Sequence, residues 1–434
     1  MTRRLTRAAA VPLIATSIAC AGSAGSSELD ADALPPLELV EELRIGSLDD
    51  PDSGFAAIHG VDVDRDGNVY AFEGQSAQLR VYDPEGRRVR TIGRRGEGPG
   101  EFEDSPLFGV VGDTIWTYDM RLRRITLFDR AGTVLSTSRL EGLAVDLQQP
   151  GSIGYVMPRE VLPAGGFLGE LRLFTSRRRN SAEPWPVQPT DTVPVPRVIF
   201  DAAGAVVDTI DWDSRPPPDD NRAETVMVGG TRYYIPVPRS ADRSSMPVGV
   251  DRLRVSGPSS TTGAEDSFTV TRTRPGGDTV FHRRFSYQPQ PYADVVLDRL
   301  AWRSARVPGG GIPIVNGVLM PRPARADSAE AFRAIRAALD FPEYQPPVER
   351  VWVGEDGSIW LSREDDGGAT RRWAVLQPDG RPRGQIELPN DSWIENAGRG
   401  GGLRLAWASG DLVWMIEYDE FDVPWLVRFR VAAH

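Results

Sequence analysis

An internal repeat constrains the fold of this chain more than any other feature of its sequence. Three residues near the N-terminal end return at one shared offset of 46 positions: Tyr70 as Trp116, Tyr82 as Phe128, and Gly86 as Gly132. Within each unit, short runs of alternating apolar and polar residues are separated by turns rich in Gly, Asp and Asn, which predicts β-strands. A repeat of roughly 40–50 residues with four strands is typical of a propeller blade.

The same turn pattern continues along the chain and predicts six blades within residues 37–434. We expect them at about 58–93, 107–140, 155–212, 225–287, 348–389 and 403–431. The last segment has three evident strands, whereas Leu37–Ile45 reads as a strand without a hairpin partner. Because an open ring would leave two unpaired sheet edges, we expect segment 37–46 to complete the sixth blade. A seventh blade would require strands in 294–325.

Two stretches between the fourth and fifth blades have apolar residues at helical spacing, namely Asp294–Arg303 and Ser328–Leu339. They predict a short helical insertion at about 290–345 that lies over one face of the ring. The expected fold class is therefore all-β: a six-bladed β-propeller of four-stranded antiparallel blades, closed by the N-terminal strand, with this insertion.

The N-terminus is typical of an exported protein. Three arginines precede a short apolar run at Ala8–Ala19, which predicts a signal peptide over residues 1–20. Cys20 is the one cysteine, and Ser17–Cys20 resembles a bacterial lipobox, which implies lipidation of Cys20. Ordinary cleavage after Ala21 is the alternative. We expect residues 21–36 to be a flexible tether. The expected location is the periplasm, the outer membrane or the cell surface, with the membrane contacted only through the lipid.

Composition excludes several function classes. The net charge is −11 and all 50 basic residues are arginine, without a basic block, which argues against nucleic acid as a partner. One cysteine excludes intrachain disulfides, and three dispersed histidines disfavour a histidine metal centre. No nucleophile elbow, Walker loop or dinucleotide fingerprint is present. We expect a monomer.

One acidic stretch matches a calcium loop by spacing. Asp62, Asp64, Asp66 and Glu73 occupy positions one, three, five and twelve of an EF-hand loop. The flanking residues alternate as strands rather than helices, so a hairpin turn is the competing interpretation. Calcium is the one cofactor that the sequence leaves open; otherwise none is expected.

A glycine-rich run at Gly93–Phe102 should join the first two blades. Its glycines suit a tight crossing, but its arginines and backbone N–H groups could also hold an anion. The candidate ligand-binding residues are therefore Arg94, Arg95, Glu97, Glu101 and, just before the first strand, His59.

These motifs resemble those of bacterial secreted six-bladed β-propellers related to NHL repeats. The resemblance rests on Asp66–Tyr70, Val81–Gly86 and above all the G-R-x-G-x-G-P-G-E-F pattern at Gly93–Phe102. It implies a fold and an exported location, but no reaction. We therefore expect a binding or scaffold module for an envelope protein, a peptide or a glycan. The alternative, by analogy with propeller lactonases, is a calcium-dependent hydrolase with its site in the central channel.

Overall fold

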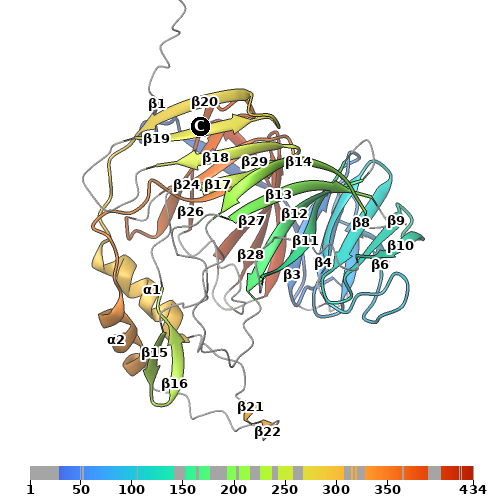
Figure 1. The fold of residues 1–434 in the computed structure, drawn as a ribbon, viewed down its shortest axis with the longest axis horizontal. Coiled ribbons are helices and arrows are strands. Elements are labelled where there is room, and N and C mark those ends of the chain that lie inside the picture. Colours follow the sequence, from blue (N-terminus) through green and yellow to red (C-terminus); the bar gives the residue numbers. More distant parts are fainter. Residues whose placement is uncertain are drawn as a thin grey trace, which may run out of the picture.

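The chain folds into a six-bladed β-propeller in a computed structural model (Figure 1). The structure describes residues 29–48, 50, 53–104, 106–140, 152–162, 166–175, 193–201, 205–215, 225–236, 243–257, 267–306, 314–315, 318–319, 328–363, 366–389, 402–419, 421 and 423–433. Cys20 and the predicted signal peptide lie outside these residues. No helix in the described part of the chain is both long and apolar enough to cross a bilayer.

Each blade is a meander of four antiparallel strands. Blade 1 contains β3 (Ile58–Val63), β4 (Val69–Glu73), β5 (Gln78–Tyr82) and β6 (Arg88–Ile92). Blade 2 contains β7 (Leu107–Val111), β8 (Thr114–Asp119), β9 (Arg124–Asp129) and β10 (Val134–Arg139). Blade 3 contains β11 (Ser152–Val161), β12 (Phe167–Thr175), β13 (Val193–Phe200) and β14 (Val206–Arg215).

The second half of the ring repeats this order. Blade 4 contains β17 (Arg243–Val248), β18 (Asp251–Ser256), β19 (Ser267–Thr273) and β20 (Thr279–Ser286). Blade 5 contains β23 (Val348–Val353), β24 (Ile359–Arg363), β25 (Thr370–Leu376) and β26 (Pro382–Pro389). Blade 6 contains β27 (Gly402–Ser409), β28 (Leu412–Tyr418), β29 (Pro424–Ala433) and β2 (Leu37–Ile45).

The N-terminal strand closes the ring, as the sequence predicted. Strand β2 pairs antiparallel with β29, with Leu37 opposite Ala433 and Ile45 opposite Leu426. The last blade therefore combines the two ends of the chain, and β29 has a partner on both sides. The first strands of the blades lie innermost, and β3 contacts both β7 and β27 across the blade boundaries.

Large aromatic side chains at one repeat position build the interior. Tyr70, Trp116, Trp360 and Trp414 each lie on the second strand of a blade and are at most 4% exposed. Their side chains belong to apolar clusters formed between adjacent blades, such as the cluster of Trp414 with Val69 and Tyr82. The repeat offset seen in the sequence thus reflects the requirement that each blade fill the same space against its neighbour.

The predicted tether is wrong for residues 29–36, which pack on the ring. Strand β1 (Leu29–Asp30) pairs in parallel with β20, so it adds a fifth strand to blade 4. Ala31 is 1% exposed, and its carbonyl accepts a hydrogen bond from Arg363 Nη1 at 3.0 Å. The carbonyl of Leu34 accepts another from Gln385 Nε2 at 2.9 Å. Small and proline-rich sequence suggested flexibility, but buried apolar contacts and backbone pairing fix this segment.

Residues 225–235, expected in blade 4, instead form a separate hairpin of β15 (Thr225–Val228) and β16 (Thr231–Tyr234). The hairpin packs with α1 (Asp294–Arg306) and α2 (Ser328–Ala338) around a small core that includes Tyr233 and Ile335. These elements gather at one side of the ring (Figure 1). The alternating residues of the hairpin resemble a blade strand, but its apolar face meets helices rather than a sheet.

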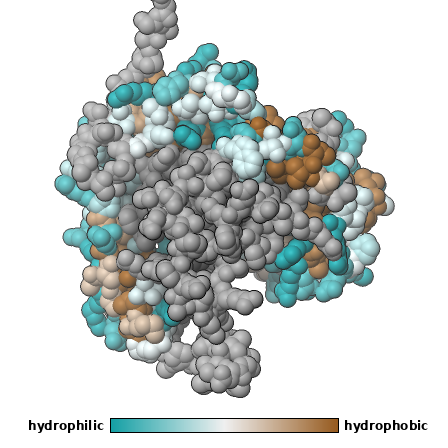
Figure 2. Space-filling view, in the orientation of Figure 1, coloured by the Kyte–Doolittle hydropathy of each residue, from teal (hydrophilic) through white to brown (hydrophobic). Residues whose placement is uncertain are grey.

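The two ends of the insertion pair with each other, and α1 is hydrogen-bonded to the β24–β25 loop of blade 5. Pro291 and Tyr344 form an antiparallel bridge, and Arg299 Nη2 donates to the carbonyl of Gly367 at 3.2 Å. Strands β21 (Ile314–Val315) and β22 (Val318–Leu319) form a further two-stranded hairpin. Apolar residues remain on the surface of the hairpin and helices, including Met227 at 58% and Tyr234 at 45% exposure (Figure 2, lower left).

Candidate functional site

The glycine-rich loop after blade 1 binds its own carboxylate. Glu101 accepts hydrogen bonds from the backbone N–H of Gly98 at 2.8 Å and from Arg94 Nε at 2.7 Å. These bonds lower the pKa of Glu101. A Cβ atom on Gly96 would lie 2.2 Å from the Glu101 carboxylate, so glycine is required for this approach. The donors that could hold an external anion in this loop are therefore already bonded to a carboxylate of the chain.

The remaining groups of the loop also serve the blade crossing. Arg95 donates to the carbonyls of Glu103, Gly74 and Gln75. The side chain of Glu97 is exposed, and its carbonyl accepts a hydrogen bond from Arg124 at 2.6 Å. Of the five predicted ligand residues, four thus lie in one loop whose polar groups are largely directed at the protein itself.

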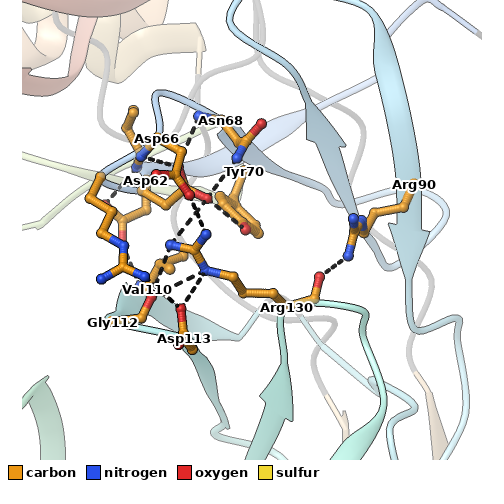
Figure 3. A network of polar contacts seen from close by, with 12 residues as sticks. Asp62, Asp66, Asn68, Tyr70, Arg90, Val110, Gly112, Asp113 and Arg130 are labelled. Carbon is orange, nitrogen blue, oxygen red and sulfur yellow. Dashed lines mark hydrogen bonds and ion pairs between the residues drawn. The ribbon is translucent and has the colours of Figure 1, made fainter.

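The four residues of the predicted calcium loop have different partners. Asp64 is 7% exposed and accepts hydrogen bonds from the backbone N–H groups of Asp66 and Asn68, both at 2.9 Å. Asp66 forms an ion pair with Arg130 of blade 2 (Figure 3), and Arg130 Nη2 also lies 4.0 Å from Asp64 Oδ2. The Asp64–Asn68 turn therefore gains its order from internal hydrogen bonds and from the neighbouring blade.

Glu73 lies at the other end of β4, away from this turn. Its carboxylate accepts hydrogen bonds from the backbone N–H groups of Ala57 at 3.2 Å and Ser76 at 2.6 Å. In the residues that the structure describes, no three His, Cys, Asp or Glu side chains are grouped so that they could hold a metal ion. The calcium-loop spacing thus does not bring its four carboxylates together.

Asp62 is directed elsewhere, toward the first strand of blade 2. Its carboxylate accepts hydrogen bonds from Val110 N of blade 2 at 2.6 Å and from Val63 N at 2.8 Å. Gly109 makes room for this contact, because a Cβ atom there would lie 3.3 Å from Asp62 Oδ2 and 2.7 Å from Trp116 Nε1. Blade 2 therefore holds Asp62 in a fixed position.

Strand pairing places residues of several blades at the level of Asp62. Asp62 lies opposite Tyr70, and the equivalent positions in blades 2, 5 and 6 are those of Gly109, Trp352 and Trp407. Glu160 takes this position in blade 3: it lies opposite Leu168, which pairs with Ile199 as Tyr70 pairs with Val81. Two carboxylates and two indoles thus share one level of the innermost strands.

The charge of Glu355 in blade 5 acts on two carboxylates of non-adjacent blades, Asp62 in blade 1 and Glu160 in blade 3. Burial, followed by the charge of Glu355 in the β23–β24 turn, raises the pKa of Asp62 to about 7. Burial and then Glu355 likewise raise the pKa of Glu160. Burial and the neighbouring Asp356 raise the pKa of Glu355 itself. Blades 1, 3 and 5 face one another only across the ring axis, so we infer that the charge of Glu355 acts across the central channel.

All three side chains retain some exposed surface, and Glu355 retains the most. A group in a narrow channel can touch water and still be surrounded by protein on most sides, which explains why burial raises these pKa values. The hydrogen bonds of Asp62 oppose the shift but do not cancel it. The channel therefore holds carboxylates whose negative charges are only partly compensated by the protein.

Replacing Glu355 by glutamine should lower the pKa of Asp62. Removing one negative charge across the channel should shift that pKa down by about one unit or less. A carboxylate whose pKa is higher in the folded than in the unfolded state lowers the stability of the fold as pH rises from about 4 toward 7. Glu355→Gln removes such a group, so it should raise the melting temperature more at pH 8 than at pH 4. Carboxylate ¹³C titration and thermal melts would measure both effects.

The exposed Glu85 in a blade 1 turn provides the control for this variant. Glu85→Gln removes the same charge far from the axis and should leave the Asp62 titration unchanged. An unchanged Asp62 titration in Glu355→Gln would contradict the proposed charge coupling across the channel.

His59 lies two strand positions before Val61, at the opposite end of β3 from the Asp64–Asn68 turn. Burial, and then the positive charge of Arg404 in blade 6, lower the pKa of its imidazole. The ring packs on Gly74, where a Cβ atom would lie 2.4 Å from His59 Cε1. Among the predicted site residues, Asp62 and His59 are thus the two that lie on the innermost strand of a blade.

Sequence reasoning missed Glu160, Glu355 and Trp407. The signal that connects them is the repeat position, because Glu160 and Trp407 are equivalent to Asp62. Blade 3 diverges most from the repeat, so its sequence does not show that Glu160 is equivalent to Asp62. Glu355 lies in a turn, and only the closed ring brings it near Asp62.

Comparisons with known proteins assign no family. No family model matches the chain, and no curated protein matches it. Among solved structures, a member of the DUF4221 family from Bacteroides vulgatus has 12% identity and a TM-score of 0.43, covering 92% of this chain and 99% of that chain. Virginiamycin B lyase from Staphylococcus aureus has 10% identity and a TM-score of 0.34, with 91% and 99% covered. Regucalcin from Agrobacterium tumefaciens has 11% identity and a TM-score of 0.33, covering 92% of this chain and 96% of that chain. These scores are too low to transfer an activity or a ligand.

Proposed function

We propose that this protein is an exported, lipid-anchored binding module whose channel takes up a positively charged side chain of an envelope protein or peptide. The observation that carries the proposal is the placement of Asp62 and Glu160 at one level of the innermost strands, with Glu355 in the neighbouring turn of blade 5. The pKa values of all three carboxyl groups are raised, which agrees with this placement. A cation placed among them would relieve their repulsion and favour their ionised forms.

The surroundings of the carboxylates favour an organic cation. Trp352 and Trp407 lie at the same repeat level and are only partly buried. Aromatic rings attract ammonium and guanidinium groups, so we expect these indoles to contribute to binding. Asp62 is fixed by Val110 of blade 2, so the site needs little reorganisation on binding. Of the ligand classes expected from the sequence, a basic peptide segment matches this chemistry better than a neutral glycan.

Export and anchoring rest on the N-terminal sequence, with Cys20 as the proposed lipidation site. The strap at residues 29–36 leaves the ring beside blade 4, where β1 pairs with β20. A lipid on Cys20 would thus hold the propeller within a few residues of the membrane surface. Intact-mass measurement of the membrane-associated protein tests this part: a mature chain that begins at Gly22 without lipid would overturn it.

The binding function is tested with a tetra-arginine peptide whose ends are blocked, titrated calorimetrically into the chain from residue 29. We expect binding that weakens with salt and strengthens from pH 6 to pH 8, because Asp62 ionises with a pKa of about 7. The double variant Glu160→Gln/Glu355→Gln should lose about tenfold or more in affinity. Equal affinity in the double variant and the Glu85→Gln control would refute the channel site.

A further inference from the structure

We infer a second ligand site in the channel: an oxyanion-binding site built on Arg404 beside His59, which takes a carboxylate or a phosphate group. It lies toward the start of the innermost strands, whereas the acidic group lies toward their ends. Arg404 is opposite Ile416 near the beginning of β27, and its Nη2 donates to the carbonyl of Ile58 at the beginning of β3, at 2.8 Å. This site does not depend on the proposed cation site.

The guanidinium of Arg404 is largely buried, and among the described residues no carboxylate is bonded to it. Burial lowers the pKa of Arg404, and the group that opposes this shift is the phenol of Tyr418 rather than an acid. Its Nε is fully buried and has no hydrogen-bond acceptor among the residues that the structure describes. Its hydrogen bond to Ile58 uses a neutral carbonyl, and no carboxylate of the described residues forms an ion pair with it, so burial of its positive charge is unfavourable.

Within the described part of the chain, the acidic groups near His59 form no ion pair with Arg404, and Glu73 is bonded to its own turn. Glu73 and Asp104 both act on the pKa of His59, in the direction that raises it. Glu73 is 1% exposed, and its oxygens accept hydrogen bonds from Ala57, Gln75 and Ser76. The carboxylate of Glu73 therefore cannot turn to Arg404 without breaking the β4–β5 turn. An external anion is the simplest source of the missing charge.

The repeat places more arginines at this level. Arg350 lies opposite Ser362 in blade 5, and Arg243 lies opposite Val255 in blade 4, both at the register position of Arg404. In blade 1 the same position is Gly60, where a Cβ atom would lie 2.9 Å from Phe108. Three successive blades thus carry arginine at one position of their innermost strands, and the first blade carries no side chain there.

This arrangement suits an oxyanion. Guanidinium groups present paired N–H donors that match the geometry of carboxylate and phosphate oxygens. Arg404 and His59 both retain exposed surface, so a ligand can reach them from the channel. The channel would then offer opposite charges at its two levels.

The test titrates inorganic phosphate and acetate, each against chloride at matched ionic strength, into the chain from residue 29. Thermal shift and calorimetry measure binding. We expect one or both oxyanions to bind where chloride does not, and the stronger of the two identifies the source as phosphate or carboxylate. Arg404→Gln should weaken binding by about tenfold or more, and Arg404→Lys, which keeps the charge but not the paired donors, should weaken it less.

Arg381→Gln is the matched control, because Arg381 is 72% exposed in the β25–β26 turn and pairs with Asp379. It should bind the oxyanion as the unmodified chain does. If Arg404→Gln does not fold, Arg404→Lys alone tests the proposal. An oxyanion affinity of Arg404→Lys equal to that of the unmodified chain would overturn the site. Equal responses to chloride, phosphate and acetate would overturn it too. Loss of oxyanion binding with retained tetra-arginine binding would leave the cation proposal intact.

Discussion

A chain that begins at residue 47, and so lacks β2, should fail to show a cooperative unfolding transition. Strand β2 supplies the fourth strand of blade 6 and covers the edge of β29 from Leu426 to Ala433. Without it, buried residues such as Val427 would lie next to an open edge, which is prone to aggregation. Net stabilities of domains are only about 5–15 kcal/mol, so the loss of a nine-residue strand is expected to exceed what the ring can sustain.

A chain that begins at residue 29 is the control, because it keeps both β1 and β2. Circular dichroism melts and size-exclusion chromatography would compare the two. Adding a synthetic peptide of residues 37–46 to the shorter chain should restore a cooperative melt, whereas a peptide of scrambled order should not. A shorter chain that melts like the control would show that closure does not depend on β2.

Replacing Phe102 by alanine should destabilise the fold by about 3–5 kcal/mol. Phe102 is 1% exposed and packs its ring against Phe72 and Phe128, at centroid distances of 5.5 and 6.2 Å. Its backbone also fixes the glycine-rich loop, donating to the carbonyl of Arg94 at 2.8 Å. Blades 1 and 2 thus share this side chain, and its removal leaves a cavity between them.

The same chemical change at Phe421, which is 70% exposed, provides the control and should alter stability by less than about 0.5 kcal/mol. Urea denaturation would measure both variants, with the change read from the midpoint at constant slope. A Phe102→Ala variant as stable as Phe421→Ala would mean that the ring of Phe102 does not hold the first two blades together.

The network between the first two blades shows why one motif was ambiguous. The spacing of Asp62, Asp64 and Asp66 fits both a calcium loop, which uses acids at alternate positions, and a strand that ends in a tight turn, where Asp is a favoured residue. In the folded chain, Asp66 pairs with Arg130, and Asp64 caps the turn (Figure 3). Arg130 is 64 residues from Asp66, so a local pattern could not reveal the partner that decides between the two interpretations.

The sequence by itself determined the architecture, because each blade must place the same kinds of residue at the same offsets. Turn glycines such as Gly67 and Gly86 have positive φ angles. Glycine adopts such angles without strain, so its place in the repeated turn pattern already predicted these turns. Aromatic residues at the position of Tyr70 fill each blade boundary. Local turn chemistry and strand periodicity are properties of neighbouring residues, so they can be read without coordinates.

Only the tertiary structure decided where charges meet. Asp62, Glu160 and Glu355 are almost 300 positions apart at the extremes, and they approach one another because the ring closes. Arg404 approaches Ile58 for the same reason. The packing of residues 29–36 and the separate β15–β16 hairpin also depend on distant partners. Electrostatic and packing energies depend on the distance between residues in space, which cannot be read from their separation along the chain.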